Sequence, residues 1–327
     1  MGIFTKSLGI DAGSAYIRVC TDGKYEVFSQ PSLAVIDAAS GKVVCVGDEA
    51  EEMMSDTPGD AVAVRPVKGG VLAEYDVACE ILKKTITRVL GKQRIKPVVT
   101  VAVPSGATDV EIRALKSALI ASGAKSVQII ETAVAAALGA GFDVNSPQGR
   151  MIVDIGAGST EIAVICMGEV VCGTTLRIAG NDFDNDIKSF VKKHYGINIG
   201  EKTAEITKIN IGSLCEQKSL AEFTVNGRDA ASGLPGSAVI NSAEVGGAVG
   251  GNVKRILDAI RFVLEKTPIE ILSDISQSGI VLTGGGARFK GLCDLIRMQT
   301  GIETVLADNC ETAVVRGCAI AISNTIN

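Results

Sequence analysis

Two stretches of the sequence place an aspartate directly before a glycine-rich turn, with an apolar run on each side. The first reads SLGIDAGSAYIRVC (residues 7–20) and the second reads MIVDIGAGSTEIAVIC (residues 151–166). Glycines in such a turn permit positive φ and let backbone N–H groups approach an anion without a Cβ in the way. The hydroxyls of Ser14 and Ser159 add donors, so each turn can hold a phosphate group.

The two aspartates, Asp11 and Asp154, would repel a phosphate unless a cation lay between them. In proteins Mg²⁺ binds through one or two carboxylates together with the phosphates of a substrate. The two turns therefore predict a hydrated Mg²⁺ held by Asp11 and Asp154. Either stretch alone is usually no more than a turn, so the prediction depends on the pair and on its matched flanks.

A third glycine run, GIVLTGGGARFKG (residues 279–291), lies between a strand-like and a helical segment. Its glycines would let a flat nucleoside lie close to the backbone. A plain strand-to-helix turn explains the same pattern, and both interpretations stay open.

The elements that must position these turns alternate between strand and helix patterns, which predicts an α/β fold with central mixed sheets. In this fold the two aspartate turns belong to β-hairpins that face one another. The clearest helix follows Pro104, where Ser105 or Thr108 can cap it, and closes at Gly123. Strands are expected at 7–10, 17–21, 98–103, 151–155, 161–166, 170–176 and 280–282. Other helices are expected at 77–90, 132–138, 182–194, 203–211 and 248–265, with a small peripheral subdomain around 215–245.

Composition bounds the class of protein. With 327 residues the chain exceeds a usual single core, so a bilobal unit or two domains is expected. Its net charge is −5 with scattered Lys and Arg, so no nucleic-acid partner is expected. Nine cysteines without a CxxC pair are expected to be reduced and buried, which favours the cytosol. The single histidine, His194, is expected at a surface helix end, and neither a signal peptide nor a membrane span is expected.

The three turns, in this order, resemble the phosphate-one, phosphate-two and adenosine motifs of the ATPase superfamily of actin, hexokinase and the heat-shock chaperones. Within that superfamily the chain resembles the bacterial actin family MreB/Mbl over essentially its whole length. The supporting segments are TPGDAVAVRPVKGGVLAEYDV (57–77), VAVPSGATDVEIRA (101–114), IIETAVAAALGAGF (129–142), INIGEKTAEITKINIGS (197–213), GRDAASGLP (227–235) and LEKTPIEILSDISQSGIVLTGGGARFKGL (264–292).

The resemblance implies an actin-like (ribonuclease-H-like duplicated) two-lobed α/β fold with a nucleotide cleft between the lobes. Lobe I would comprise residues 1–145 and 306–327, with a small subdomain at about 31–69. Lobe II would comprise residues 146–305, with a small subdomain at about 184–245. ATP and Mg²⁺ are the implied cofactors. The implied partners are further copies of the chain in protofilaments, the inner face of the cell membrane and the cell-shape machinery, with a cytoplasmic location.

The resemblance also assigns site residues by position. The first phosphate turn would comprise Asp11, Gly13, Ser14, Ala15, Tyr16 and Arg18, and the second Asp154, Gly156, Ala157, Gly158 and Ser159. Near the ribose or phosphates would lie Gly180 and Asp182, near the adenosine Glu205 and Lys208, and against the adenine Gly284, Gly285 and Gly286. The positions linked to hydrolysis are Glu131, Thr132 and Ser159.

The first phosphate turn departs from the family pattern. The family reads Asp-Leu-Gly-Thr-Ala-Asn-Thr, whereas this chain has Tyr16 for the Asn and Ile17 for the last Thr, which removes one polar phosphate contact. Arg18 falls where the family has an apolar residue and eukaryotic actin has a Lys. Two placements stay open for Arg18: it restores positive charge at the phosphates, or it lies on the solvent face of its strand.

A second departure concerns hydrolysis. The family has two adjacent acids and a Pro where this chain has Glu131, Thr132 and Ala133, and the second acid, thought to position the attacking water, aligns with Thr132. A hydroxyl can hold a water but does not easily take its proton, and loss of a general base costs about a hundredfold or more in rate. Ser159 replaces a Thr, which is a milder change. We expect ATP binding with slow hydrolysis unless Glu131 takes over the role.

The expected function is that of an ATP-binding cytoskeletal protein whose filaments serve cell shape and cell-wall elongation. A plasmid-segregation actin and a small-molecule kinase of the same superfold stay as alternatives, because the fold alone does not fix function. A chaperone ATPase is disfavoured, since it needs a further substrate-binding domain. For the membrane, Ile3, Phe4 and Lys6 are a weak anchor. The loop at 91–96, with Ile95 and bases nearby, either attracts anionic lipid or is simply solvated.

Overall fold

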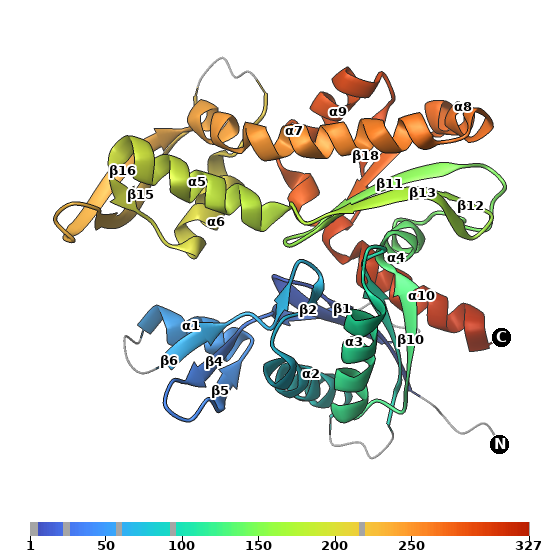
Figure 1. Ribbon diagram of the computed structural model, residues 1–327, viewed down its shortest axis with the longest axis horizontal. Coiled ribbons are helices and arrows are strands. Elements are labelled where there is room, and N and C mark those ends of the chain that lie inside the picture. The colour runs from blue at the N-terminus through green and yellow to red at the C-terminus, as the bar shows by residue number, and fades with distance from the viewer. Residues whose placement is uncertain (1–5, 22–26, 57–60, 92–95, 216–219, 327) are drawn as a thin grey trace.

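Two five-stranded sheets organise the chain into two lobes (Figure 1). The computed structural model describes residues 6–21, 27–56, 61–91, 96–215 and 220–326. Lobe I is built on the sheet with strand order β10-β9-β1-β2-β3, and lobe II on the sheet β13-β12-β11-β17-β18. The first sheet comprises β1 (Ser7–Ala12), β2 (Tyr16–Thr21), β3 (Val27–Pro31), β9 (Val98–Val103) and β10 (Ser126–Glu131). The second comprises β11 (Arg150–Ile155), β12 (Thr160–Cys166), β13 (Glu169–Leu176), β17 (Ile280–Thr283) and β18 (Thr304–Leu306).

The two sheets have the same topology. In each, three successive antiparallel strands lie on one side, and the first of them pairs in parallel with a later strand, which pairs in parallel with a fifth. The hairpin β1–β2 of lobe I therefore corresponds to β11–β12 of lobe II. This repeat of a whole sheet accounts for the two matched aspartate turns in the sequence.

Burial on both faces explains why β11 is an almost continuous apolar run. Met151, Val153 and Ile155 point into the core of lobe II, while Ile152 belongs to a second cluster between the lobes. A strand covered on both sides needs apolar residues at every position rather than at alternate ones.

Helices cover the outer face of the lobe I sheet. They are α2 (Tyr75–Leu90) and α3 (Asp109–Ala121). Of the two caps predicted for α3, the structure uses Thr108, which forms a capping box with Glu111. Beside them lies the small subdomain of β4 (Ala34–Asp37), β5 (Val43–Val46), α1 (Asp48–Asp56) and β6 (Ala61–Val64), followed by the hairpin β7 (Val67–Lys68) and β8 (Val71–Leu72).

Lobe II carries its own helices and a small distal sheet, β14-β15-β16. Its helices are α5 (Gly180–Tyr195), α6 (Glu201–Ile211), α7 (Ser242–Lys266), α8 (Ile269–Ser278) and α9 (Leu292–Thr300), and the distal strands are β14 (Ile197–Asn198), β15 (Glu222–Asp229) and β16 (Pro235–Asn241). The predicted start of α7 at residue 248 is wrong, because the helix begins six residues earlier. An Asn241–Glu244 capping box and the burial of Val245 and Val249 outweigh the glycines that argued against a helix there.

Two helices of small residues join the lobes. They are α4 (Thr132–Gly139) and α10 (Ala313–Ile326), which lie side by side (Figure 1), and α10 also packs against β1. A Cβ added to Gly317 would lie 1.7 Å from the Ala135 carbonyl oxygen, and one on Gly139 would lie 1.8 Å from that of Ala313. The two helices therefore cross with their backbones in direct contact, which only glycine permits at these positions.

Several smaller predictions can be compared with the structure. The nine cysteines remain thiols, but Cys215 is exposed, so the prediction that all are buried is wrong for it. His194 lies exposed in the last turn of α5, 3.0 Å from the Phe190 carbonyl oxygen, as predicted. None of the helices in the described ranges has the length and apolar character to cross a bilayer. Ile3, Phe4 and Ile95, named for membrane contact, lie outside the described residues.

Candidate functional site

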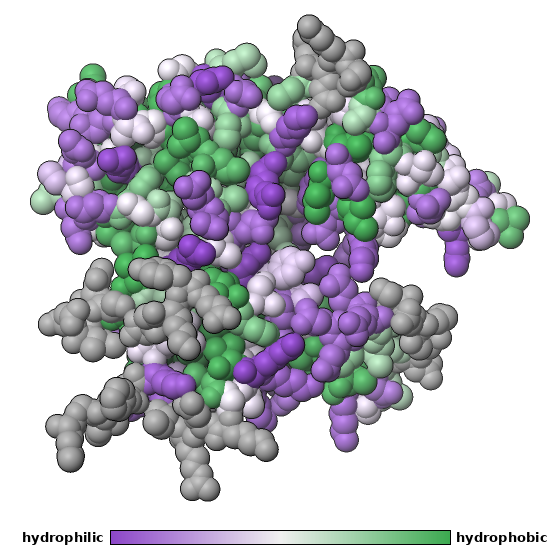
Figure 2. Space-filling view, turned by 180° about the vertical axis from the view of Figure 1, so that it is seen from behind, coloured by the Kyte–Doolittle hydropathy of each residue, from purple (hydrophilic) through white to green (hydrophobic). Residues whose placement is uncertain are grey.

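A cavity of about 730 Å³ lies between the lobes and takes residues from both. This volume suits a nucleotide-sized ligand. In the space-filling view a notch separates the upper and lower halves, with hydrophilic side chains on both of its edges (Figure 2). Most of the predicted site residues line the cavity: Asp11, Gly13, Ser14, Ala15, Tyr16, Arg18, Thr132, Asp154, Gly156, Ala157, Gly158, Ser159, Gly180, Glu205, Lys208, Gly284, Gly285 and Gly286.

The two aspartate turns meet across the cavity, as the sequence predicted. Each closes its hairpin with one backbone bond, from Gly13 N to Tyr16 O (3.1 Å) and from Gly156 N to Ser159 O (3.0 Å). A Cβ on Gly158 would lie 2.3 Å from the Ser14 hydroxyl oxygen, so the close approach of the turns requires glycine there. The remaining N–H groups of the turns are available to an anion between them.

Asp11 and Asp154 both line this cavity. Asp154 is 6% exposed, and its Oδ1 accepts a hydrogen bond from the Thr283 hydroxyl at 2.9 Å. Burial raises the pKa of Asp154 to about 7; the hydrogen bond from Thr283 opposes this rise, and the charge of Asp11 adds to it. Burial also raises the pKa of Asp11.

A buried carboxylate and a half-buried one that repel one another fit a divalent cation, which would offset both their desolvation and their repulsion. In the described part of the chain no group of three or more His, Cys, Asp or Glu side chains could hold a metal ion. Asp11 and Asp154 would therefore share Mg²⁺ with phosphate and water oxygens, the coordination that Mg²⁺ prefers.

Arg18 faces the cavity. Its Nη1 lies 3.7 Å from Oδ2 of Asp11, the residue directly opposite in the β1–β2 register, and its guanidinium lies over the Tyr16 ring. The alternative that placed Arg18 on the solvent face of its strand is therefore wrong. Tyr16 supports the guanidinium from the cavity edge, in the position where the family has a polar Asn.

The opposite wall is formed by α5, α6 and the third glycine run. Lys208 Nζ lies 2.9 Å from Asp184 Oδ2 and 3.1 Å from the Gly180 carbonyl oxygen, so its charge is fixed beside the cavity. Gly284 has φ of +83°, and a Cβ there would lie 2.2 Å from the Ile155 carbonyl oxygen. The run thus packs on β11 before the short η1 helix (Gly286–Arg288).

Two predicted site residues are not among those that line the cavity. The Asp182 carboxylate accepts a hydrogen bond from Ala179 N at 2.9 Å and so caps the start of α5. Glu131 is exposed, and its Oε2 accepts a hydrogen bond from the Ser105 hydroxyl at 2.7 Å. The cavity wall itself carries the neighbouring Thr132.

Sequence reasoning missed part of the wall. The missed lining residues include Gly70, Pro104, Asn181, Arg288, Phe289, Lys290, Cys310, Glu311 and Thr312. Some come from connections without a recognisable motif, such as η2 (Cys310–Thr312), which brings the chain into α10. Arg288, Phe289 and Lys290 directly follow the three glycines of the third run. A buried acid near the cavity, Glu161, was also missed, although a single Glu in the apolar run of β12 was a visible signal.

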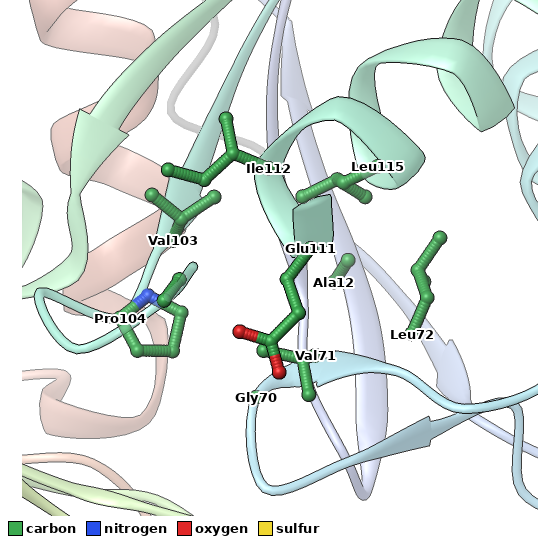
Figure 3. Close-up of a pocket in the computed structure, with 10 residues that line it drawn as sticks. Ala12, Gly70, Val71, Leu72, Val103, Pro104, Glu111, Ile112 and Leu115 are labelled. Carbon is green, nitrogen blue, oxygen red and sulfur yellow. The ribbon is translucent and has the colours of Figure 1, made fainter. Parts of the chain in front are cut away.

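A second cavity beside the first is far too small for a nucleotide. It has a volume of about 10 Å³, room for roughly one water. Figure 3 shows the apolar side chains of Val103, Ile112 and Leu115 around it, with the Glu111 carboxylate near Gly70. The cavity between the lobes is therefore the candidate site.

The model of the MreB/Mbl protein family matches residues 5–327. The cell shape-determining protein Mbl of Bacillus subtilis (strain 168) is 39% identical over 98% of this chain and 97% of its own length. The cell shape-determining protein MreB of Escherichia coli (strain K12) is 41% identical over 97% of this chain and 93% of its own.

Solved structures agree with the fold. MreB5 of Spiroplasma citri bound to ADP superposes with a TM-score of 0.92 at 34% identity, covering 99% of this chain and 98% of that one. The same protein bound to AMPPNP gives a TM-score of 0.93 with 99% of both chains covered. The MamK double helical filament gives 0.82 at 21% identity, over 98% of this chain and 99% of that one, which shows the fold alone. The predicted actin-like, two-lobed α/β fold is confirmed.

Proposed function

The chain belongs to the MreB/Mbl family of actin-like proteins, and from this premise we propose that it binds ATP between its lobes and polymerises into filaments that determine cell shape. The observation that carries the proposal is the meeting of the two aspartate turns across one cavity of nucleotide size. The relatives' names, cell shape-determining proteins, favour this function over a plasmid-segregation actin or a small-molecule kinase.

In this proposal the backbone N–H groups of both turns, with Ser14 and Ser159, bind the phosphates. Asp11 and Asp154 hold Mg²⁺, which when bound neutralises phosphate charge. Arg18 supplies a fixed positive charge at the same end of the cavity, supported by its pairing with Asp11. The adenosine lies toward Glu205 and Lys208, against the glycines at 284–286.

Hydrolysis of the bound ATP is slow in this proposal. The Thr132 hydroxyl lines the cavity and can hold a water, but it does not accept a proton at neutral pH. Glu131 has the required carboxylate but is bound to Ser105 outside the cavity wall. ADP and AMPPNP complexes are known for the Spiroplasma citri relative, which supports nucleotide binding in this chain.

Self-association into filaments is proposed on the ground of the chain's membership of the actin-like MreB/Mbl family. Peripheral contact with the inner face of the cell membrane stays a prediction, because the apolar residues named for it, Ile3, Phe4 and Ile95, lie outside the described ranges.

Light scattering of the purified protein with and without Mg-ATP tests the polymerisation proposal. We expect scattering to rise with Mg-ATP in the native chain and to stay flat in Asp154→Ala, which loses one proposed magnesium ligand. Asp186→Ala, which removes an acid of α5 bound to Asn252 outside the cavity, is the control and should polymerise. An absence of Mg-ATP-dependent scattering in the native protein at any concentration would contradict the proposal.

A further inference from the structure

Glu161 is a carboxylate buried at the boundary between the lobes. It lies in β12, opposite Asp154 on one side and Thr175 on the other, and is only 1% exposed. Burial raises the pKa of the Glu161 carboxyl. Its Oε1 is buried and has no hydrogen-bond partner in the described part of the chain. Burying a carboxylate oxygen without a hydrogen-bond partner costs folding free energy. The contacts of the second oxygen, Oε2, explain what the residue does.

The second oxygen, Oε2, reaches across the boundary. It accepts a hydrogen bond from the Thr175 hydroxyl at 2.7 Å and another from the backbone N–H of Ser105 at 3.3 Å. Thr175 belongs to the sheet of lobe II, whereas Ser105 follows β9 of lobe I. Thr175 Oγ1 also accepts a hydrogen bond from Gly106 N at 3.1 Å, so two successive residues of lobe I are held by one Glu–Thr pair of lobe II.

Ser105 connects Glu161 to Glu131 through two hydrogen bonds. Its backbone N–H donates to Glu161 Oε2, and its hydroxyl donates to Glu131 Oε2 at 2.7 Å. The chain neighbours Pro104 and Thr132 both line the nucleotide cavity, while Glu131 does not. The hydrogen bonds therefore fix the Glu131 carboxylate beside the cavity rather than in it.

We propose that Glu161 and Ser105 are positioning residues that form a latch between the lobes, holding Glu131 out of the nucleotide cavity and so restraining ATP hydrolysis. The inference rests on the proposed ATP-binding function. In that hydrolysis a water oxygen bonds to the γ-phosphorus while the bond to the bridging oxygen breaks, and its electron pair leaves with ADP. The proton of the water needs an acceptor, which Thr132 does not provide and a released Glu131 does.

The latch is joined directly to the phosphate turn. Glu161 follows Ser159 by two residues, and the turn at 156–159 is the one that would bind phosphate. Both belong to the β11–β12 hairpin, so the latch lies within one strand of the proposed phosphate site.

Two variants open the latch without touching the cavity wall. Ser105→Ala deletes the hydroxyl that binds Glu131, and Glu161→Gln replaces a charged acceptor with a weaker neutral one of the same shape. The hydrogen bond between Ser105 and Glu131 is exposed, so its loss raises the population of free Glu131 by at most about tenfold. We expect Ser105→Ala to raise the kcat of phosphate release by up to about tenfold, and Glu161→Gln to raise it less. The KM for ATP should stay within about twofold, since no cavity residue changes.

The matched control is Ser276→Ala, whose hydroxyl binds only a carbonyl within α8, and it should leave kcat unchanged. The double variant Ser105→Ala/Glu131→Gln should be no faster than Glu131→Gln alone, because the latch acts through Glu131. Affinity for a fluorescent ATP analogue is measured in parallel. If Ser105→Ala binds the ATP analogue normally but its kcat is unchanged or lower, the latch proposal is wrong and the ATP-binding proposal stands. The same conclusion follows if the double variant releases phosphate as fast as Ser105→Ala. Absence of ATP binding in the native chain overturns the proposed function and the latch with it.

Discussion

At the scale of single residues, Asp11 and Asp154 set the charge of the cavity that they both line. Burial raises the pKa of Asp154 to about 7, and the charge of Asp11 adds to this rise. Arg18, opposite Asp11 in the β1–β2 register, lies 3.7 Å from the Asp11 carboxylate and balances part of this negative charge.

The raised pKa of Asp154 has a consequence for the stability of the metal-free protein. The folded form keeps the proton up to pH about 7, whereas the unfolded form loses it near the ordinary value of 3.8. Between these values the folded state binds more protons, so the free energy of unfolding falls as pH rises. Asp154→Asn cannot acquire the charge. We expect it to melt at least about 2 °C above the native chain at pH 8, with a smaller difference at pH 5.

Thermal denaturation in EDTA without nucleotide measures this difference. Asp186→Asn, on α5 outside the cavity wall, serves as the control. An Asp154→Asn variant that melts below the native chain at pH 8 would show that the carboxylate stabilises the metal-free fold, contrary to this prediction.

The role of Glu161 could not be predicted from the sequence alone. A lone acid in the strand TEIAVIC was visible in the sequence, but its hydrogen bonds go to Ser105 and Thr175, which lie far from it in the chain. Only the assembly of both sheets shows what it holds.

At the scale of elements, the strands around the aspartate turns were predicted to within two residues, because short apolar runs bounded by glycine define them well. The expectation for α7 failed at its first turns, where glycines lower helix propensity and tertiary packing decides instead. Helix α10 was not predicted. Its sequence, AVVRGCAIAISNTI, has no polar face that would mark it as a helix, because it packs against α4 and β1 at the lobe boundary.

The crossing of α4 and α10 yields a prediction about stability. Gly317→Ala would place a Cβ 1.7 Å from the Ala135 carbonyl oxygen, and neither backbone can yield without moving a helix. We expect a loss of about 3 kcal/mol or more in the free energy of unfolding. Urea denaturation followed by circular dichroism measures it.

Gly247→Ala provides the matched control, since this glycine lies within α7 with open space where its Cβ would be. It should stabilise the protein by about 0.5–1 kcal/mol through its higher helix propensity. If Gly317→Ala were as harmless as Gly247→Ala, the close helix crossing described here would be wrong.

At the scale of the whole molecule, ion pairs join the small subdomains across the mouth of the cleft. Arg65 Nε lies 3.7 Å from Glu201 Oε2, and Lys202 Nζ lies 3.5 Å from Glu51 Oε1. Arg65 and Glu51 belong to lobe I, whereas Glu201 and Lys202 begin α6 of lobe II. At least one side chain of each pair is more than 60% exposed, so each pair contributes at most about 1 kcal/mol and is screened by salt.

These pairs predict how fast the cleft opens. Arg65→Glu replaces an attraction to Glu201 with repulsion and should raise the dissociation rate of ATP about three- to tenfold at low ionic strength. Adding Glu201→Arg restores the attraction and should restore the rate. Stopped-flow release of a fluorescent ATP analogue measures both variants. A rate unchanged in Arg65→Glu, or not recovered in the double variant, would mean that these pairs do not govern opening.

The two-lobed architecture could be predicted from the internal repeat and from the family resemblance, not from individual residues. The repeat of one sheet leaves two similar hairpins in the sequence, and the resemblance of the whole chain to one family supplied the lobes. The position of Glu131 beside the cavity rather than in it could not be foreseen, because it depends on Ser105 and on the contact between the lobes. Local sequence patterns do not predict contacts between segments that are far apart in the chain.

In the proposed function, the twin aspartate turns close over one magnesium nucleotide. Calorimetric titration of ATP into the purified protein, in Mg²⁺ and in EDTA, measures this binding. We expect saturable binding of one ATP per chain in Mg²⁺, weaker by about tenfold or more in EDTA and in Asp154→Asn. Binding that is absent in Mg²⁺, or equally tight without the metal and without the Asp154 carboxylate, would contradict it.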